Sequence, residues 1–183
     1  MKKVYLIILV ALVGVFFYMD KSFYFAQDKE AKILFVGDMM FDRYIRQVGY
    51  NKGEDYVFSC VNNFLRDFDL VIGNLEGPIT ENASVSIFTK PDSPDNYRFT
   101  FPSDTAKILV KNNIKLVNLG NNHIGNFGQT GIDSTKKFLK ESGVNYIDDS
   151  SVYITKIGGQ NISFISYNEF EEMTPEKFLL SAQ

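Results

Sequence analysis

Residues 69–78 read DLVIGNLEGP, and this stretch decides the fold that the sequence predicts. It begins with an apolar run typical of a buried strand and ends in a polar cluster closed by glycine and proline. The same order occurs at 33–43, where the run leads into a glycine and an aspartate, and at 116–123, where it leads into two asparagines and a histidine. Ligands of open α/β sheets bind beyond the carboxyl ends of the strands, so the three clusters are expected to share one cleft.

Strand-like and helix-like segments alternate around these clusters, which predicts an α/β fold with a mostly parallel sheet and flanking helices. Two further strands flank the sequence Gly158-Gly159-Gln160-Asn161, a hairpin signal, so an antiparallel pair joins late. The expected strands are 32–37, 69–73, 115–119, 144–147, 152–157 and 162–167, and the expected helices are 55–68, 103–112 with Ser103 as N-cap, and 130–142 ending at Gly143.

Length and composition fit one globular domain with a short extension, because 45% of the 183 residues are hydrophobic. The formal net charge is only −3 and no basic cluster is present, which argues against a nucleic-acid partner. Cys60 is the one cysteine, so an intramolecular disulfide and a cysteine metal site are excluded. Its apolar neighbours predict a buried thiol, with a reactive thiol as the alternative.

Residues 1–25 predict a membrane segment. Lys2 and Lys3 precede sixteen uncharged, mostly apolar residues, a pattern that favours an uncleaved signal anchor at the cell membrane with the domain on the extracytoplasmic side. A cleaved signal peptide is the alternative, but a cut after Ala26 would place the large Tyr24 at position −3. Residues 26–31 are then a linker and 32–183 the domain.

Each polar cluster also has an ordinary structural interpretation. Asp38 could cap a helix or form an Asx-turn, Glu76 could be a solvated loop residue, and His123, the only histidine, could be structural. Their joint occurrence at three successive strand ends indicates a site instead. Carboxylate, amide and imidazole groups together suit a hard or borderline divalent metal and predict a metal-dependent hydrolase site or its remains.

Three segments carry a specific resemblance. FVGDMM at 35–40 followed by Arg43, DLVIGNLEGP at 69–78, and LGNNH at 119–123 resemble the CapA family of poly-γ-glutamate capsule biosynthesis proteins, which belong to the calcineurin-like phosphoesterase superfamily. The resemblance extends over about residues 33–167. It implies a metallophosphatase-like layered sandwich.

The same resemblance implies roles for individual residues. Asp38, Glu76 and Asn122 would bind metal, and His123 would act as the acid or stabilise the transition state. Arg43 would bind an anionic oxygen, as a guanidinium does in a bidentate fork. The implied cofactors are one or two divalent ions of Mn, Zn, Fe or Mg.

One departure from the family pattern concerns histidine. The family has histidine motifs further along the chain, whereas this sequence has none after His123. A helix also opens cleanly at Thr174 and Pro175, a few residues before the last one. We therefore expect 32–183 to be the N-terminal part of a longer domain, and leave open whether this chain is an enzyme.

Three functions remain as hypotheses. The first is a membrane-anchored protein for the biosynthesis or export of a capsule of poly-γ-glutamate or another anionic polymer, working with membrane subunits of a polymer synthase. The others are a secreted metal-dependent phosphoesterase or nucleotidase acting on a phosphoester, and a non-catalytic surface binding module. The first is favoured because typical phosphoesterases carry Asp-x-His at strand one, whereas Asp38 is followed by Met39 and Met40.

Overall fold

The centre of the molecule is a parallel sheet in the order β1-β2-β3-β4, as the alternation of segments predicts. The structure is a computed structural model that describes residues 30–168. The predicted membrane segment, most of the linker and the helix opening at 174–175 lie outside the described residues. The strands are β1 (Ile33–Met39), β2 (Leu70–Leu75), β3 (Ile114–Asn118) and β4 (Asn145–Ile147).

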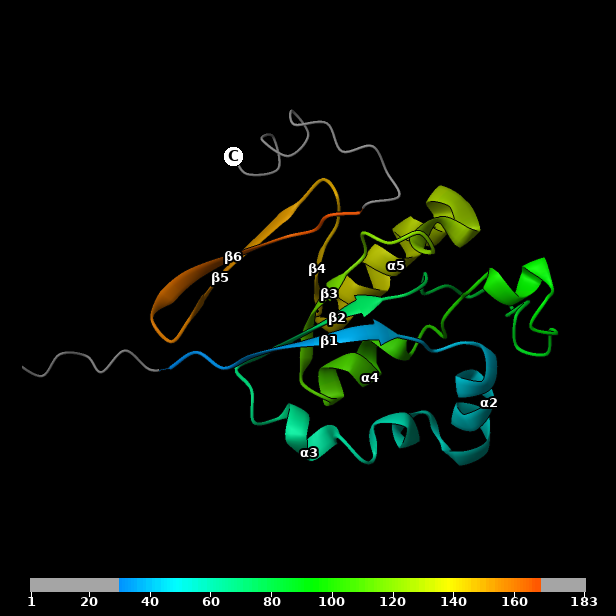
Figure 1. The fold of residues 1–183 in the computed structure, drawn as a ribbon, viewed down its shortest axis with the longest axis horizontal. Helices are drawn as coiled ribbons and strands as arrows, with labels where there is room; N and C mark the ends of the chain where they lie inside the picture. The colour runs from blue at the N-terminus through cyan, green and yellow to red at the C-terminus, as the bar shows by residue number, and fades with distance from the viewer. Residues whose placement is uncertain (1–29, 169–183) are drawn as a thin grey trace, which may run out of the picture.

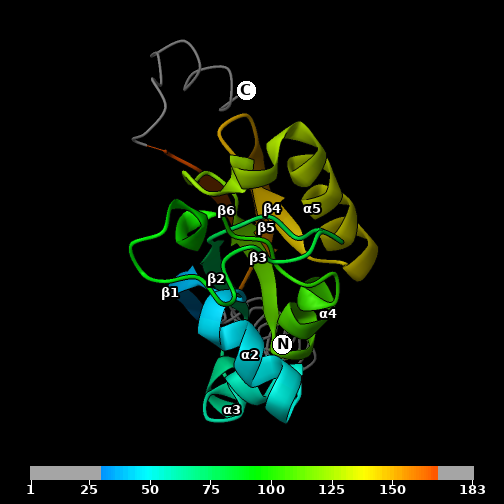
Figure 2. The same cartoon turned by 90° about the vertical axis from the view of Figure 1, so that its right-hand side faces the viewer.

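Helices cover one face of this sheet. α2, α3 and α4 lie on the side opposite the hairpin (Figure 1), and α4 and α5 lie side by side (Figure 2). Their buried side chains, such as Leu109 of α4 and Leu139 of α5, pack with Val71 and Leu75 of β2 in the larger core. The helical segments are α2 (Arg43–Lys52), η1 (Glu54–Phe58), α3 (Asn62–Leu65), η2 (Pro94–Tyr97), α4 (Thr105–Lys111), η3 (Ile124–Phe127) and α5 (Gly128–Ser142).

The predicted hairpin covers the opposite face of the sheet (Figure 1). It consists of β5 (Val152–Ile157) and β6 (Gln160–Ile165), and Phe164 packs with Leu70, Ile72 and Leu116 in a second, smaller core. Gly158 and Gly159 form the two-residue turn with φ values of 61° and 92°. Both values are positive, as a type I′ turn requires, which explains the two glycines.

Side chains alternate along β2 between the two layers, and this alternation positions the site. Leu70 and Ile72 face the hairpin, so Asn74 continues the same row at the carboxyl end of the strand. On β3, Leu116 and Asn118 are related in the same way. Each row is therefore apolar under the hairpin and polar where the strand ends.

The helix predicted at 55–68 is wrong. Two short helical segments, η1 and α3, replace it, and Val61 between them has φ −122° and ψ −10°, which breaks the helical stripe. Of the apolar residues expected on one buried face, Leu65 is buried whereas Val61 and Phe64 are exposed. Cys60 is exposed as well, so the expectation of a buried thiol is also wrong.

Helix α2 was not predicted, although its start signal is present. Asp42 precedes the helix in extended conformation, and its carboxylate accepts a hydrogen bond from the backbone N–H of Arg43. It is fully buried and also binds Ser84 Oγ at 2.5 Å and Thr100 N at 2.8 Å. The Arg46 side chain lies 3.4 Å from it. Asp42 thus fixes α2 and the loop of residues 78–101 against each other.

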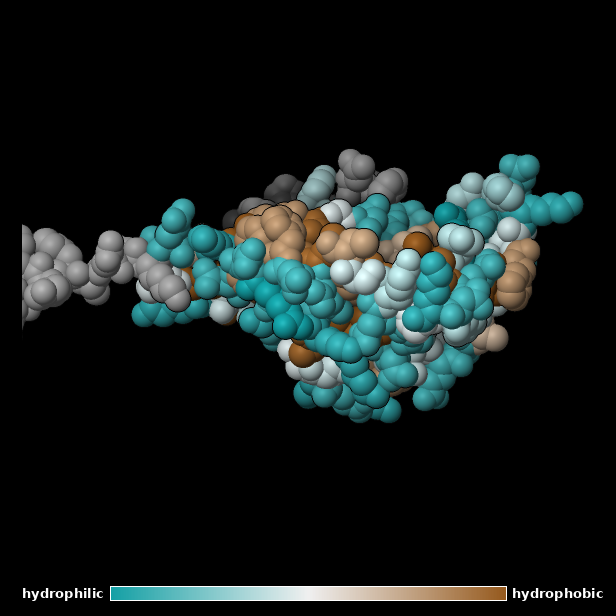
Figure 3. Space-filling view, turned by 90° about the horizontal axis from the view of Figure 1, so that it is seen from below, coloured by the Kyte–Doolittle hydropathy of each residue, from teal (hydrophilic) through white to brown (hydrophobic). Residues whose placement is uncertain are grey.

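The surface seen from below is mainly hydrophilic, with hydrophobic residues gathered toward one side (Figure 3). Between residues 30 and 168, no helix combines the length and the apolar character that crossing a membrane requires.

Candidate functional site

An open cleft of about 320 Å³ lies at the carboxyl ends of β1, β2 and β3. Its position agrees with the expectation from the three polar clusters. The segment after β6 forms part of its wall, so the cleft opens on the hairpin side of the sheet. No lysine or arginine is among the described residues that line it, which are Asp38, Asn74, Glu76, Asn118, Gly120, Asn121, Asn122, Tyr167 and Asn168.

Asp38 and Glu76 are held together by the side chain of Asn74. Asn74 Nδ2 donates to Asp38 Oδ1 at 2.8 Å and to Glu76 Oε2 at 2.5 Å, so these two oxygens are no more than 5.3 Å apart. Burial raises the pKa of Glu76, and Asp38 raises it further, while His123 and Asn74 act in the opposite direction. The net result is a pKa above the usual 4.5. Two carboxylates therefore share one site, as the sequence predicts.

His123 lies beside Glu76 in a fixed orientation. Its Nε2 is 3.7 Å from Glu76 Oε1, and its ring packs on Phe99 with a centroid separation of 4.3 Å. The oxygen of Asn126 accepts from Phe99 N at 2.7 Å, and a backbone N–H can only donate. His123 Nδ1, 3.3 Å from the same oxygen, must then carry a proton to bond to it. Nε2 is left facing Glu76.

Arg43 does not line the cleft. Its Nε donates to Asn96 O at 2.7 Å, and its guanidinium carbon lies 4.5 Å from the Phe99 ring centre and 5.2 Å from that of Tyr97. Phe99 contacts both this guanidinium and the His123 ring. The structure therefore brings Asp38, Glu76, Asn122 and His123 together, while Arg43 lies outside the cleft lining and packs on Phe99.

The donor groups of the cleft fit a hard divalent cation. Asp38 and Glu76 offer carboxylate oxygens, and exposed Asn122 offers an amide oxygen. Ions such as Mg²⁺ bind through one or two carboxylates and keep several waters. Within residues 30–168, no group of three or more His, Cys, Asp or Glu side chains could hold a metal ion. The donors that this part of the chain does offer, two carboxylates and an amide oxygen, fit an ion that keeps part of its water shell.

Comparison with known proteins identifies the family. Residues 32–181 match the family described as "Bacterial capsule synthesis protein PGA_cap". The chain belongs to this capsule synthesis family. The resemblance stated from the sequence motifs is thereby confirmed.

Two curated relatives are similar to most of the chain. The "Capsule biosynthesis protein CapA" of Bacillus anthracis is 25% identical over 150 residues, which is 78% of this chain. The "PGA biosynthesis protein CapA" of Bacillus subtilis (strain 168) is 29% identical over 143 residues, which is 74% of the chain. In both cases the match spans 36% of the relative's length, so the chain corresponds to about a third of these proteins.

Several lining residues of this family member were missed as site residues. They are Asn74, Asn118, Asn121, Tyr167 and Asn168. The signal for Asn74 and Asn118 was the alternation along their strands, since each is polar where the buried row reaches the strand end. Nothing local in the sequence marks Tyr167 and Asn168, because only the folding of the hairpin over the sheet brings them to the cleft.

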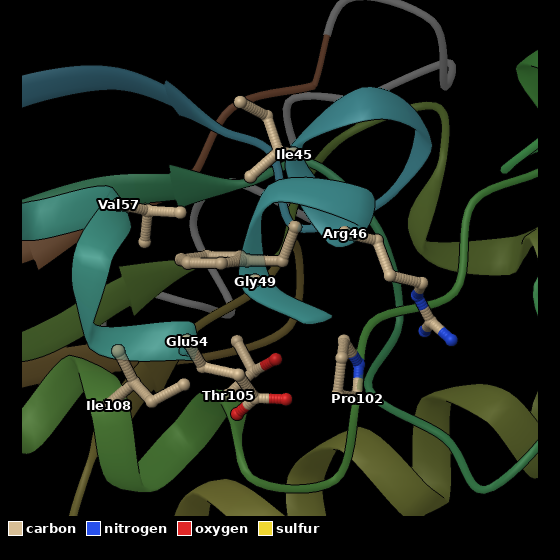
Figure 4. Close-up of a pocket in the computed structure, with 9 residues that line it drawn as sticks. Ile45, Arg46, Gly49, Glu54, Val57, Pro102, Thr105 and Ile108 are labelled. Carbon is tan, nitrogen blue, oxygen red and sulfur yellow. The ribbon is translucent and has the colours of Figure 1, made fainter. Parts of the chain in front are cut away.

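A smaller hollow lies away from the strand ends, between α2, η1 and α4 (Figure 4). Its volume is about 20 Å³, room for one water molecule, and its wall is mainly apolar. The oxygens of Glu54 and Thr105 point into the same space (Figure 4), and buried Thr105 Oγ1 makes no hydrogen bond to any residue that the structure describes. Its size and position make this hollow a packing feature rather than a second substrate site.

Proposed function

We propose that this member of the capsule synthesis family is anchored in the cell membrane and acts outside it on an anionic polymer or phosphoester. In this proposal the cleft works with one hard divalent cation. The observation that carries it is the pair Asp38 and Glu76, which Asn74 holds together in a cleft where the lining residues between 30 and 168 include no lysine or arginine.

The argument for the cation is electrostatic. A carboxylate or phosphate group entering the cleft would meet two negative charges. At a separation of about 5 Å and an effective dielectric constant of about 20, the repulsion between each pair of unit negative charges costs about 3 kcal/mol. A divalent cation bound by Asp38 and Glu76 reverses this repulsion, and when bound it also supplies Lewis acidity.

The chain's own residues have distinct roles in this proposal. Asp38, Glu76 and Asn122 would hold the ion, since all three line the cleft. His123 would present Nε2 to a substrate oxygen, with Asn126 fixing the ring through Nδ1, and it would act as acid or hydrogen-bond donor when both ring nitrogens carry protons. Arg43 would bind an anionic group further out, because among the described residues its guanidinium makes one hydrogen bond, from Nε, and otherwise packs on aromatic rings.

The proposed location rests on the sequence of residues 1–25. Lys2 and Lys3 before the apolar run favour an anchor whose domain is extracytoplasmic. The proposed partners are other membrane subunits of a capsule polymer synthase and the polymer itself. The curated relatives, which are named as capsule or PGA biosynthesis proteins, support this assignment of pathway.

A binding module without catalysis is the second candidate. It is favoured by one observation, that residues 30–168 contain no group of three strong metal-type ligands. Such a module would use the cation only to bridge its own carboxylates to those of the polymer.

One experiment tests both candidates. Binding of poly-γ-glutamate and hydrolysis of a generic phosphodiester are measured with Mn²⁺ and with chelator, for the wild-type chain and for Glu76→Gln. We expect polymer binding that requires Mn²⁺ and is weakened by the substitution. Hydrolysis of the phosphodiester in addition to polymer binding would support an enzyme. Polymer binding without hydrolysis would support the binding module. Polymer binding that is unchanged by chelator would contradict the cation-based proposal.

A further inference from the structure

A chain of three asparagines links the backbone to the two carboxylates of the cleft. Asn121 Oδ1 accepts from the backbone N–H groups of His123 and Ile124, at 3.0 and 2.9 Å. Backbone N–H groups can only donate, so the orientation of the Asn121 amide is fixed. Its Nδ2 must then face the opposite way, toward Leu75 O at 2.9 Å and Asn74 Oδ1 at 3.0 Å.

The orientation of Asn74 follows from that of Asn121. Asn74 Oδ1 accepts from Asn121 and, at 3.3 Å, from Asn118 Nδ2. Rotating the Asn74 amide by 180° would place its NH₂ group against those of Asn121 and Asn118, and its oxygen against two carboxylates. Its Nδ2 is therefore committed to Asp38 and Glu76. Asn74 could not offer its oxygen to a cation without breaking this chain of hydrogen bonds.

We propose that Asn74 is a positioning residue, which holds Asp38 and Glu76 at the separation that one divalent cation requires without itself binding the ion. This inference rests on the proposed function, since it assumes that a cation binds there. Carboxylates that ligate metals are commonly held by hydrogen bonds from outer residues, and loss of such a partner costs 10- to 100-fold in metal affinity. Asn74 supplies that hydrogen bond to both carboxylates at once.

The test is the affinity of the full 183-residue chain for Mn²⁺, purified in mild detergent. We expect the dissociation constant to rise about 10- to 100-fold in Asn74→Ala. Asn74→Ser restores one donor group, so its dissociation constant for Mn²⁺ should lie between those of the wild type and Asn74→Ala. Thermal melts in chelator report the stability of each variant separately.

The matched control is Asn112→Ala. Asn112 is also buried and donates through Nδ2 at 2.9 Å, but to Ile108 O at the end of α4, just before the amino end of β3. It should lose stability without any change in Mn²⁺ affinity. A purely structural role of Asn74 would give the same result for both alanine variants.

The outcomes separate this inference from the proposed function. If the wild-type chain binds Mn²⁺ and Asn74→Ala binds it with equal affinity, the positioning role is overturned and the cation site stays in place. Equal affinity of Asn74→Ser and wild type, should the alanine variant not fold, would overturn it as well. Absence of Mn²⁺ binding by the wild-type chain would overturn the proposed cation and, with it, this inference.

Discussion

At the scale of single residues, the site shows which parts of its chemistry a sequence can reveal. The proximity of Asp38, Glu76 and His123 could be predicted because each comes soon after an apolar run, and parallel strands bring their ends together; their roles as site residues stay a prediction. The hydrogen bonds by which Asn74 bridges the two carboxylates could not be predicted, since they depend on the pairing of Asp38 with Asn74 across β1 and β2. That pairing follows an irregularity in β1 after Phe35, which no local pattern predicts.

Gly120 gives a prediction at this scale. A Cβ atom at this position would lie 2.0 Å from Ser166 Oγ and 2.6 Å from Asp149 Oδ1, and these two side chains are hydrogen-bonded to each other. Gly120→Ala should therefore lower the free energy of unfolding by about 1–3 kcal/mol, the usual cost of overpacking. Urea unfolding followed by circular dichroism measures this change.

Gly125→Ala is the matched control, because a Cβ atom there would meet nothing within 4 Å. Its free energy of unfolding should stay close to that of the wild type. If the two variants were equally stable, the close approach of Ser166, just after β6, to Gly120, just after β3, would not exist in solution.

At the scale of elements, local signals predicted some segments and missed others. The helix ending at Gly143 was predicted, and Gly143 adopts the left-handed conformation with φ 78°. The hairpin was found because two glycines separate two apolar runs. The helix at 55–68 was wrong because an apolar stripe does not show whether a core is available to bury it. Helix α2 was overlooked because its cap, Asp42, is stabilised by Ser84 and Thr100, which lie far from it in the sequence.

The turn after β4 provides a prediction about pH. Burial alone would raise the pKa of Asp148, but hydrogen bonds from Lys136, Ser151 and Ser150 outweigh it and lower the pKa from 3.8 to about 2. The ion pair with Lys136 has an N–O distance of 2.7 Å and links α5 to this turn. Because the pKa is lowered in the folded state, the stabilisation is complete above pH 4 and is lost between about pH 4 and pH 2.

Asp148→Asn should accordingly reduce the free energy of unfolding by about 1–2 kcal/mol at pH 7, after allowance for solvent screening. Urea unfolding at pH 7 and pH 3 measures the difference between wild type and variant. That difference should shrink at pH 3. A difference that is the same at both pH values would mean that the ionised form of Asp148 contributes nothing.

At the scale of the whole molecule, the apolar residues that stabilise the fold and the polar residues of the cleft lie in different places. Two cores, one under the helices and one under the hairpin, hold the sheet, while the polar groups gather at one end of it. The match to the capsule synthesis family covers residues 32–181, and thus both cores and the cleft. The family assignment and the sheet were accessible from the sequence, because they depend on motifs and alternation rather than on contacts between distant side chains.

The proposed location leads to a prediction for the whole molecule. If residues 1–25 anchor the chain with Lys2 and Lys3 inside, the domain is accessible from outside the membrane. Protease added to intact spheroplasts should digest it, whereas a cytoplasmic marker protein stays intact. Protection of the domain until the spheroplasts are lysed would contradict this topology.

The central claim is that Asp38 binds a divalent cation in the cleft, and thermal melts of wild type and Asp38→Ala test it most directly. In chelator, the variant should melt close to wild type, because removing one of two repelling carboxylates offsets the lost hydrogen bond to Asn74. With Mn²⁺ at 100 times its dissociation constant, the wild type should gain about 2.7 kcal/mol of stability, and the variant should lose most of that gain. Equal Mn²⁺-induced shifts in the two proteins would show that Asp38 is not a ligand and would contradict the account.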